Sequence, residues 1–261
     1  MKIEKIYFKN ENQRIEGILH LPKKQTKSLV ILVHGFTGTE DGPDGIFIEL
    51  AEKLASKGFA VLRYNFRYTT SDLSEFQKMT IKGEVSDLKL IIDKISKKYD
   101  KIGIVGESLG AGISILSYDD RIKCLVLWYP AVFLRETEFK ERFLTEEALR
   151  GLRKKGFLTG KKRNGKEYKV SENFVNELKT INLMPKIKEV SSPTLLIHGY
   201  YDITVPFNHS ERLLSILKEP KKLIKIDADH GWHEKNSETY DAKVQKQVID
   251  FTIEWFKTWL K

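Results

Sequence analysis

Apolar residues gather in short runs along most of the chain, and segments with helical spacing lie between these runs. Four compact runs predict buried strands: Ser28–Val33, Ala60–Phe66, Lys101–Val105 and Lys123–Tyr129. Two amphipathic segments between them predict helices: Ile46–Lys57 and Ile81–Lys98. Strands that alternate with helices in this way indicate an α/β fold with a mostly parallel, doubly wound sheet.

The two ends of the chain extend this sheet. Antiparallel edge strands are expected at Glu4–Lys9 and Arg14–Leu21, and two further strands at Pro193–Gly199 and Lys222–Asp227. Asp241–Leu260 is amphipathic, which predicts a closing helix that packs on the sheet. The apolar stripe of that helix is expected at Val244, Val248, Phe251, Trp255 and Trp259, with Thr252 at its edge.

The pattern changes over residues 131–191. A polar helix at Thr145–Lys155 is followed by two short apolar segments around Asn164-Gly165, a pair that favours a hairpin turn. Ser171 is suited to cap a further helix at Glu172–Leu178. We interpret residues 131–191 as a cap inserted into a single α/β core, which then comprises residues 1–130 and 192–261.

Residues Gly106–Gly110 read G-E-S-L-G and lie between an apolar run and a helix-compatible segment. Strand, sharp turn and helix in this order form the context in which a G-x-S-x-G motif exposes a nucleophilic serine. The flanking glycines let the strand and the helix approach where a Cβ atom would clash. The pattern therefore predicts Ser108 as a nucleophile.

A glycine-rich turn, His34–Gly38, follows the first buried strand. Such a turn can present a backbone N–H towards a reacting carbonyl group. We therefore predict an oxyanion hole formed by the amide of Phe36 and the amide of Leu109, the residue after the nucleophile.

An acid and a base are expected at the carboxyl ends of the last two strands. Asp202 and His230 follow those strands, so the chain order is Ser, Asp, His. His233 is the alternative base, but His230 directly follows its strand. Asp227 and Asp229 are the alternative acids. Asp229 is adjacent to His230 in sequence, where side chains diverge, which favours Asp202.

Four motifs in this order resemble the α/β-hydrolase superfamily over nearly the whole chain: H-G-F-T-G at His34–Gly38, G-E-S-L-G at Gly106–Gly110, H-G-Y-Y-D-I-T-V-P at His198–Pro206 and D-A-D-H-G-W at Asp227–Trp232. The chain is most similar to the small serine esterases that include cinnamoyl (feruloyl) esterases and acylaminoacyl-peptidase-like hydrolases. This resemblance implies a lid at the predicted cap and favours His230 as the base. Glu107 departs from the His, Gln or Asp that such relatives often carry before the serine.

These residues together predict hydrolysis of carboxylic esters of small to medium acyl or aryl-acyl groups through an acyl-serine. Three aromatic residues are expected to contact the substrate: Phe157, Tyr168 and Trp232. Peptidase, thioesterase or lactonase activity on the same residues is the alternative. A non-catalytic binding module is a lower alternative, because it would be expected to have lost one of Ser108, Asp202 and His230.

The chain has 261 residues and a formal net charge of +9. Asp and Glu are interleaved with Lys throughout, so we expect a solvated basic surface and no nucleic-acid partner. A nucleic-acid-binding protein is the alternative that such a charge permits. Relatives of this kind often form homodimers, so the resemblance permits a homodimer.

Composition also bears on location and on cofactors. No apolar stretch approaches the roughly 20 residues of a membrane span, and the start lacks the apolar run of a secretory signal. The single cysteine, Cys124, suits a reducing compartment. We therefore expect a cytoplasmic protein with no membrane partner. His230-x-x-His233 has no third ligand at a suitable spacing, so no metal is expected, and no cofactor is implied.

Overall fold

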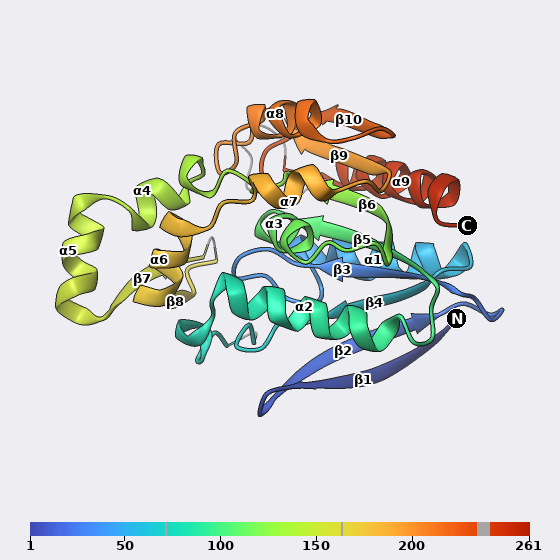
Figure 1. Ribbon diagram of the computed structural model, residues 1–261, viewed down its shortest axis with the longest axis horizontal. Helices are drawn as coiled ribbons and strands as arrows, with labels where there is room; N and C mark the ends of the chain where they lie inside the picture. The colour runs from blue at the N-terminus through green and yellow to red at the C-terminus, as the bar shows by residue number, and fades with distance from the viewer. Residues whose placement is uncertain (71, 163, 234–240) are drawn as a thin grey trace.

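The computed structural model describes residues 1–70, 72–162, 164–233 and 241–261. Within these residues an eight-stranded sheet has the order β1-β2-β4-β3-β5-β6-β9-β10 (Figure 1). Its strands are β1 (Lys2–Asn10), β2 (Gln13–Leu21), β3 (Ser28–Val33), β4 (Ala60–Tyr64), β5 (Lys101–Glu107), β6 (Ile122–Trp128), β9 (Thr194–Gly199) and β10 (Lys221–Ile226). β2 pairs antiparallel with β1 and β4, and all other neighbours are parallel. The predicted α/β fold class is confirmed.

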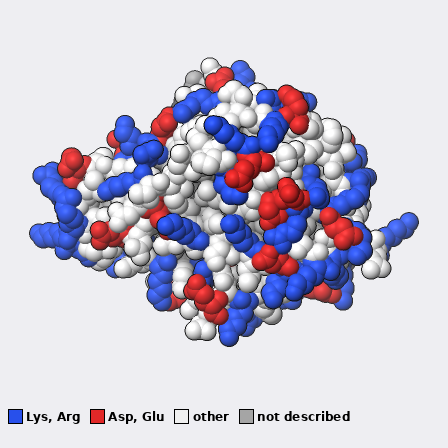
Figure 2. Space-filling view, in the orientation of Figure 1, with Lys and Arg blue, Asp and Glu red and all other residues white. Residues whose placement is uncertain are grey.

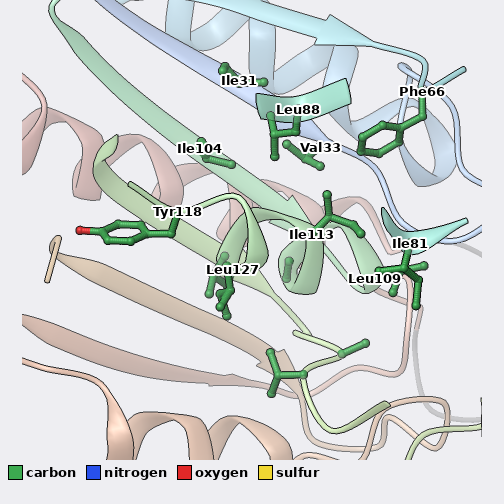
Figure 3. Packing of buried hydrophobic residues seen from close by; sticks show 14 of the residues in the cluster. Ile31, Val33, Phe66, Ile81, Leu88, Ile104, Leu109, Ile113, Tyr118 and Leu127 are labelled. Carbon is green, nitrogen blue, oxygen red and sulfur yellow. The ribbon is translucent and has the colours of Figure 1, made fainter. Parts of the chain in front are cut away.

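Helices cover both faces of the sheet because its central strands are apolar on both sides. The helices of this core are α1 (Ile46–Ser56), α2 (Ile81–Ile95), α3 (Leu109–Leu116), α7 (Met184–Glu189), α8 (Asn208–Ile216) and α9 (Ala242–Trp259). In β3, Ile31 and Val33 pack in one cluster with α2 and α3, whereas Val30 and Leu32 pack in a second cluster with α1 and α9. Figure 3 shows the first cluster. The alternation of side chains along a strand thus builds two core layers.

The closing helix α9 packs on the sheet as predicted, but its buried face differs from the predicted stripe. Val244 and Val248 are buried, whereas Phe251 and Trp259 are each 40% exposed. The residues that α9 buries are Val244, Gln245, Val248, Ile249, Thr252, Ile253 and Phe256. The prediction for Phe251 and Trp259 was wrong because the helix is apolar on two adjacent faces, and the sheet covers only one of them.

Between β6 and β9 the chain forms a lobe beside the sheet, at the left of Figure 1. Its elements are α4 (Phe139–Phe143), α5 (Glu146–Lys155), β7 (Phe157–Lys161), β8 (Glu167–Ser171) and α6 (Glu172–Thr180). The predicted hairpin is confirmed, since β7 pairs antiparallel with β8. The side chain of Thr145 accepts the N–H of Ala148, and that of Ser171 accepts the N–H of Phe174, so both predicted helices begin at side-chain caps.

Charged side chains of both signs are interspersed over the face seen in Figure 2. Lysine and arginine lie there at the outer end of the lobe, where the last turn of α5 carries Arg153, Lys154 and Lys155, and also over the core. Among the helices of the described residues, none combines the length and the apolar character that crossing a bilayer requires.

Candidate active site

Ser108 lies in a tight turn between β5 and α3. Its backbone has φ 53° and ψ −118°, a conformation that a non-glycine residue adopts only under constraint. A Cβ atom on Gly110 would lie 2.4 Å from the carbonyl oxygens of Val33 and His34, so only glycine lets α3 pass the end of β3 this closely. The turn thus has the geometry expected of the G-x-S-x-G motif.

Asp202 and His230 follow adjacent strands and meet through their side chains. Nδ1 of His230 lies 2.6 Å from Oδ2 of Asp202. The other carboxylate oxygen of Asp202 accepts the N–H groups of Thr204 at 2.9 Å and Val205 at 2.8 Å. Burial alone would raise the pKa of Asp202, but the charge of His230 and the side-chain hydrogen bonds of His198 and His230 hold it below its usual value.

The imidazole of His230 is surrounded by negative charge. Burial alone would lower its pKa, but the charge and hydrogen bond of Asp202, and then the charges of Glu107 and Asp229, raise it above the ordinary value. The ring of Tyr129 packs against the imidazole with a centroid separation of 4.3 Å. His230 is therefore held in one orientation by a carboxylate on one side and an aromatic ring on another.

The alternative acid and base form a different pair. Nδ1 of His233 lies 3.1 Å from Oδ1 of Asp229, and its Nε2 lies 3.2 Å from Oδ2 of Asp44. Asp229 thus contacts His233, whereas His230 contacts Asp202. Asp227, the third candidate acid, makes no contact with His230 among the described residues. The structure thus pairs His230 with Asp202 and His233 with Asp229, and the catalytic roles of these residues stay a prediction.

The turn that follows β3 carries the predicted oxyanion donor. The N–H of Gly38 donates to the carbonyl oxygen of Gly35 at 3.0 Å, which closes the turn around Phe36. Among the described residues no acceptor is bonded to the amide of Phe36 or to that of Leu109. Both amides are therefore available to a ligand, and their role in an oxyanion hole stays a prediction.

Two further side chains of this site, Glu107 and His198, are not among the functional residues that the sequence predicts. Glu107 is buried, and its Oε2 accepts the N–H of Gly35 at 2.6 Å. Burial raises the pKa of Glu107, and the nearby His230 opposes that rise. Nε2 of His198 lies 3.3 Å from Oδ2 of Asp202. In the sequence, Glu107 stands out only as a departure from relatives, and His198 only as the first residue of one of the four motifs.

A cavity of about 740 Å³ opens at this edge of the sheet. Ser108 and His230 line it from the core, and the lobe contributes Tyr168 and three basic residues to its wall: Arg142, Lys161 and Lys162. Two of the predicted substrate contacts lie elsewhere. Phe157 is outside the cavity wall, with the Nζ of Lys169 4.4 Å from its ring centroid. Trp232 is fully buried in the core between the sheet and α9.

Trp232 and Phe157 are thus placed where they cannot line the cavity, for two different physical reasons. The backbone of Trp232 has φ 70°, which turns its indole inward against Trp128 and Tyr129. Phe157 begins β7 and pairs with Ser171, at the end of the hairpin away from the cavity-lining residues Lys161 and Tyr168. Within the described part of the chain, no three side chains of a suitable kind are placed to hold a metal ion.

Residues 49–259 match the model of the prolyl oligopeptidase family. The match covers more than half of the chain and includes Ser108, Asp202 and His230. The chain belongs to the prolyl oligopeptidase family. The resemblance to α/β-hydrolase serine esterases that the four sequence motifs indicated is confirmed.

Two curated relatives come from bacteria. It is 25% identical over 281 aligned positions to YitV of Bacillus subtilis (strain 168), whose name assigns it provisionally to the esterases; the match covers 96% of this chain and 98% of YitV. It is 34% identical over 92 residues to the uncharacterized protein YfhR of Escherichia coli (strain K12). That second match covers 34% of this chain and 29% of YfhR, less than a third of its length.

Solved structures share the fold over nearly the whole chain. Est1E from Butyrivibrio proteoclasticus is 22% identical with a TM-score of 0.74, and the match covers 97% of this chain and 99% of Est1E. A structure of Est1E with bound ferulic acid gives a TM-score of 0.76. An esterase from Pyrococcus furiosus is 19% identical with a TM-score of 0.68, over 100% of this chain and 92% of that chain. These similarities establish the α/β-hydrolase fold.

Proposed function

We propose that this member of the prolyl oligopeptidase family is a serine hydrolase that cleaves carboxylic esters of small to medium acyl or aryl-acyl groups. The observation that carries the proposal is the 2.6 Å contact between His230 Nδ1 and Asp202 Oδ2, beside a cavity that Ser108 also lines. An imidazole held through Nδ1 has its Nε2 available as a general base.

In the proposed reaction, His230 takes the proton of the Ser108 hydroxyl as its oxygen attacks the ester carbonyl. Asp202 keeps the imidazole in the required tautomer and stabilises the imidazolium. The amides of Phe36 and Leu109 hold the negative charge that develops on the carbonyl oxygen. His230 then protonates the leaving alcohol, and a water molecule that it activates hydrolyses the acyl-serine.

Two observations favour an ester over a peptide or thioester substrate: the names of similar proteins and the aromatic wall of the cavity. YitV carries an esterase name, and Est1E has been solved with ferulic acid. Phe36, Phe139 and Tyr168 give the cavity an aromatic wall suited to an apolar acyl or aryl group. A cytoplasmic location and a small-molecule substrate, with no nucleic-acid or membrane partner, belong to the same proposal.

The test is hydrolysis of p-nitrophenyl esters from acetate to dodecanoate, and of a ferulate ester, by the wild type and by Ser108→Ala. We expect Ser108→Ala to lower kcat by up to about 10⁶-fold, because the nucleophile is lost. Ser215→Ala is the matched control. Ser215 is an exposed serine of α8 whose hydroxyl donates to the carbonyl of Arg212, so its loss should leave kcat unchanged.

Two outcomes contradict the proposal. Substantial activity in Ser108→Ala overturns the assignment of the nucleophile. A wild type that is folded and inactive on every ester, but cleaves peptides or thioesters in a Ser108-dependent reaction, replaces the esterase with its rival. Absence of all three activities favours a binding module on a hydrolase scaffold.

A further inference from the structure

Lys162 follows β7 in the turn of the β7–β8 hairpin and reaches across the cavity wall to the turn after β3. Its ammonium group donates a hydrogen bond to the carbonyl oxygen of Thr37 at 2.8 Å. The side chain is half-buried at the cavity wall, and burial, followed by the charge of Lys166, lowers its pKa. The contact joins two segments that are 125 residues apart in the chain: the lobe and the turn that carries the amide of Phe36.

The Phe36 amide lies between two charged side chains that bind the backbone of its turn. Glu107 accepts the N–H of Gly35, one residue before Phe36. Lys162 binds the carbonyl of Thr37, one residue after it. Thr37 has φ 57°, a left-handed conformation that a β-branched residue adopts only when its surroundings impose it. Lys162 therefore donates its hydrogen bond to the residue of the turn whose backbone is strained.

The other basic residues of the cavity wall are engaged differently. Lys161 pairs with Glu167 at 3.3 Å, and Arg142 pairs with Glu138 at 3.2 Å, both within the lobe. Within the described ranges, Lys162 has no carboxylate at ion-pair distance, although the charge of Glu107 acts on it. A surface cation without a specific role has no reason to be half-buried against a backbone carbonyl, because burial of its charge is costly.

We propose that Lys162 is a positioning residue that couples the lobe to the oxyanion hole. By holding the Thr37 carbonyl it fixes the turn around Phe36, so that the Phe36 amide is aimed at the oxygen on which negative charge develops. The inference rests on the proposed function. Because the amide contributes most in the transition state, loss of Lys162 lowers kcat and leaves KM nearly unchanged.

The test compares Lys162→Met with Lys169→Met on the p-nitrophenyl ester that the wild type cleaves best. Methionine keeps most of the apolar stem of lysine and removes its donors. We expect Lys162→Met to lower kcat by about 10- to 100-fold with KM within about twofold, since a misplaced oxyanion donor loses most of its effect. Lys169→Met should stay within about threefold of wild type, because Lys169 lies on the same hairpin but outside the cavity wall, where its ammonium group contacts the ring of Phe157.

A conservative variant separates positioning from a general structural role. Lys162→Arg retains a donor at the same place and should recover kcat to within about tenfold of wild type, because one hydrogen bond can be remade. Thermal unfolding of all variants shows whether each remains folded. If Lys162→Met is destabilised, Lys162→Gln, which is too short to reach Thr37, repeats the measurement with a polar side chain.

The outcomes distinguish the inference from the function on which it rests. Unchanged kcat in Lys162→Met overturns the inference while the esterase stands. A rise in KM alone also overturns it, because Lys162 would then contact the substrate in the ground state. A wild type without any Ser108-dependent hydrolysis overturns the proposed function, and the inference falls with it.

Discussion

At the scale of single residues, the chemistry of the site is set by the charges around His230. The imidazole contacts Asp202 directly, and Glu107 and Asp229 act on it through their charges. A base must be neutral to accept a proton, so carboxylates that stabilise the imidazolium move the acid limb of activity to higher pH. With the pKa of His230 raised above 6.5, activity should fall as pH decreases through a value above 6.5.

Glu107→Gln tests this arrangement. Glutamine keeps an oxygen that can accept the Gly35 N–H, but it removes the negative charge beside His230. The imidazolium loses stabilisation, so the pKa of His230 decreases and the acid limb of kcat/KM shifts to lower pH. The measurement is the pH profile of kcat/KM between pH 5 and 9 on one ester, chosen to span the ordinary pKa of histidine, about 6.5.

Glu136→Gln is the control for this profile. Glu136 is exposed and pairs with Arg212 on the surface, away from the cavity wall. Its profile should coincide with that of the wild type. An acid limb of Glu107→Gln that stays in place or moves to higher pH would contradict the electrostatic role given to Glu107.

At the scale of elements, α9 is joined to the sheet by a specific polar contact as well as by apolar packing. Nε1 of Trp128, at the end of β6, donates to the hydroxyl oxygen of Thr252 at 3.2 Å. Both side chains are fully buried. The hydroxyl of Thr252 in turn donates to the carbonyl of Val248. This contact explains why a threonine lies within the buried face of an otherwise largely apolar helix surface.

Thr252→Val should destabilise the protein by about 1–3 kcal/mol, because it leaves the buried indole N–H of Trp128 without an acceptor. Urea denaturation gives the free energy of unfolding. The control is Thr258→Val, on the exposed side of α9. The hydroxyl of Thr258 also donates to the carbonyl four residues before it, as that of Thr252 does. That variant should stay within about 0.5 kcal/mol of wild type. Equal effects of the two substitutions would rule out the contact as the cause.

At the scale of the whole molecule, the lobe is attached to the core around one aromatic side chain. The ring of Phe36 packs against Phe76 of the core at a centroid distance of 5.2 Å. It also contacts Phe139 at 5.1 Å, Tyr168 at 5.3 Å and Phe174 at 5.2 Å, all from the lobe. The residue whose amide is the predicted oxyanion donor thus also holds the lobe in place.

Phe36→Ala should lower the free energy of unfolding by about 3 kcal/mol, because it opens a cavity at this junction. The backbone amide is retained, so a fall in kcat would arise from a loosened turn and lobe. Phe251→Ala provides the comparison: Phe251 is 40% exposed on α9, and its loss should cost about 0.5 kcal/mol or less. Equal stability of Phe36→Ala and wild type would show that the aromatic junction does not hold the lobe.

Local pattern was enough to predict the strands of the sheet, the hairpin of the lobe and the meeting of Asp202 with His230. Runs of apolar residues identify buried strands, and the carboxyl ends of parallel strands converge at one edge of a sheet. Side chains that follow such strands are therefore brought together whatever their distance along the chain. The contact between Asp202 and His230 is the part of this expectation that the structure bears out directly.

Other features depend on which surfaces meet in space. The sequence of α9 offers two apolar faces, and only the packing against β6 selects the one that carries Thr252. Trp232 looks like a cavity residue by its place beside His230, but its backbone turns it into the core. The bond from Lys162 to Thr37 joins positions with no local relation, so only the folded chain reveals it. The spacing of apolar residues shows which faces of a helix or strand need to be buried. Tertiary packing decides which of these faces are buried and which other elements cover them.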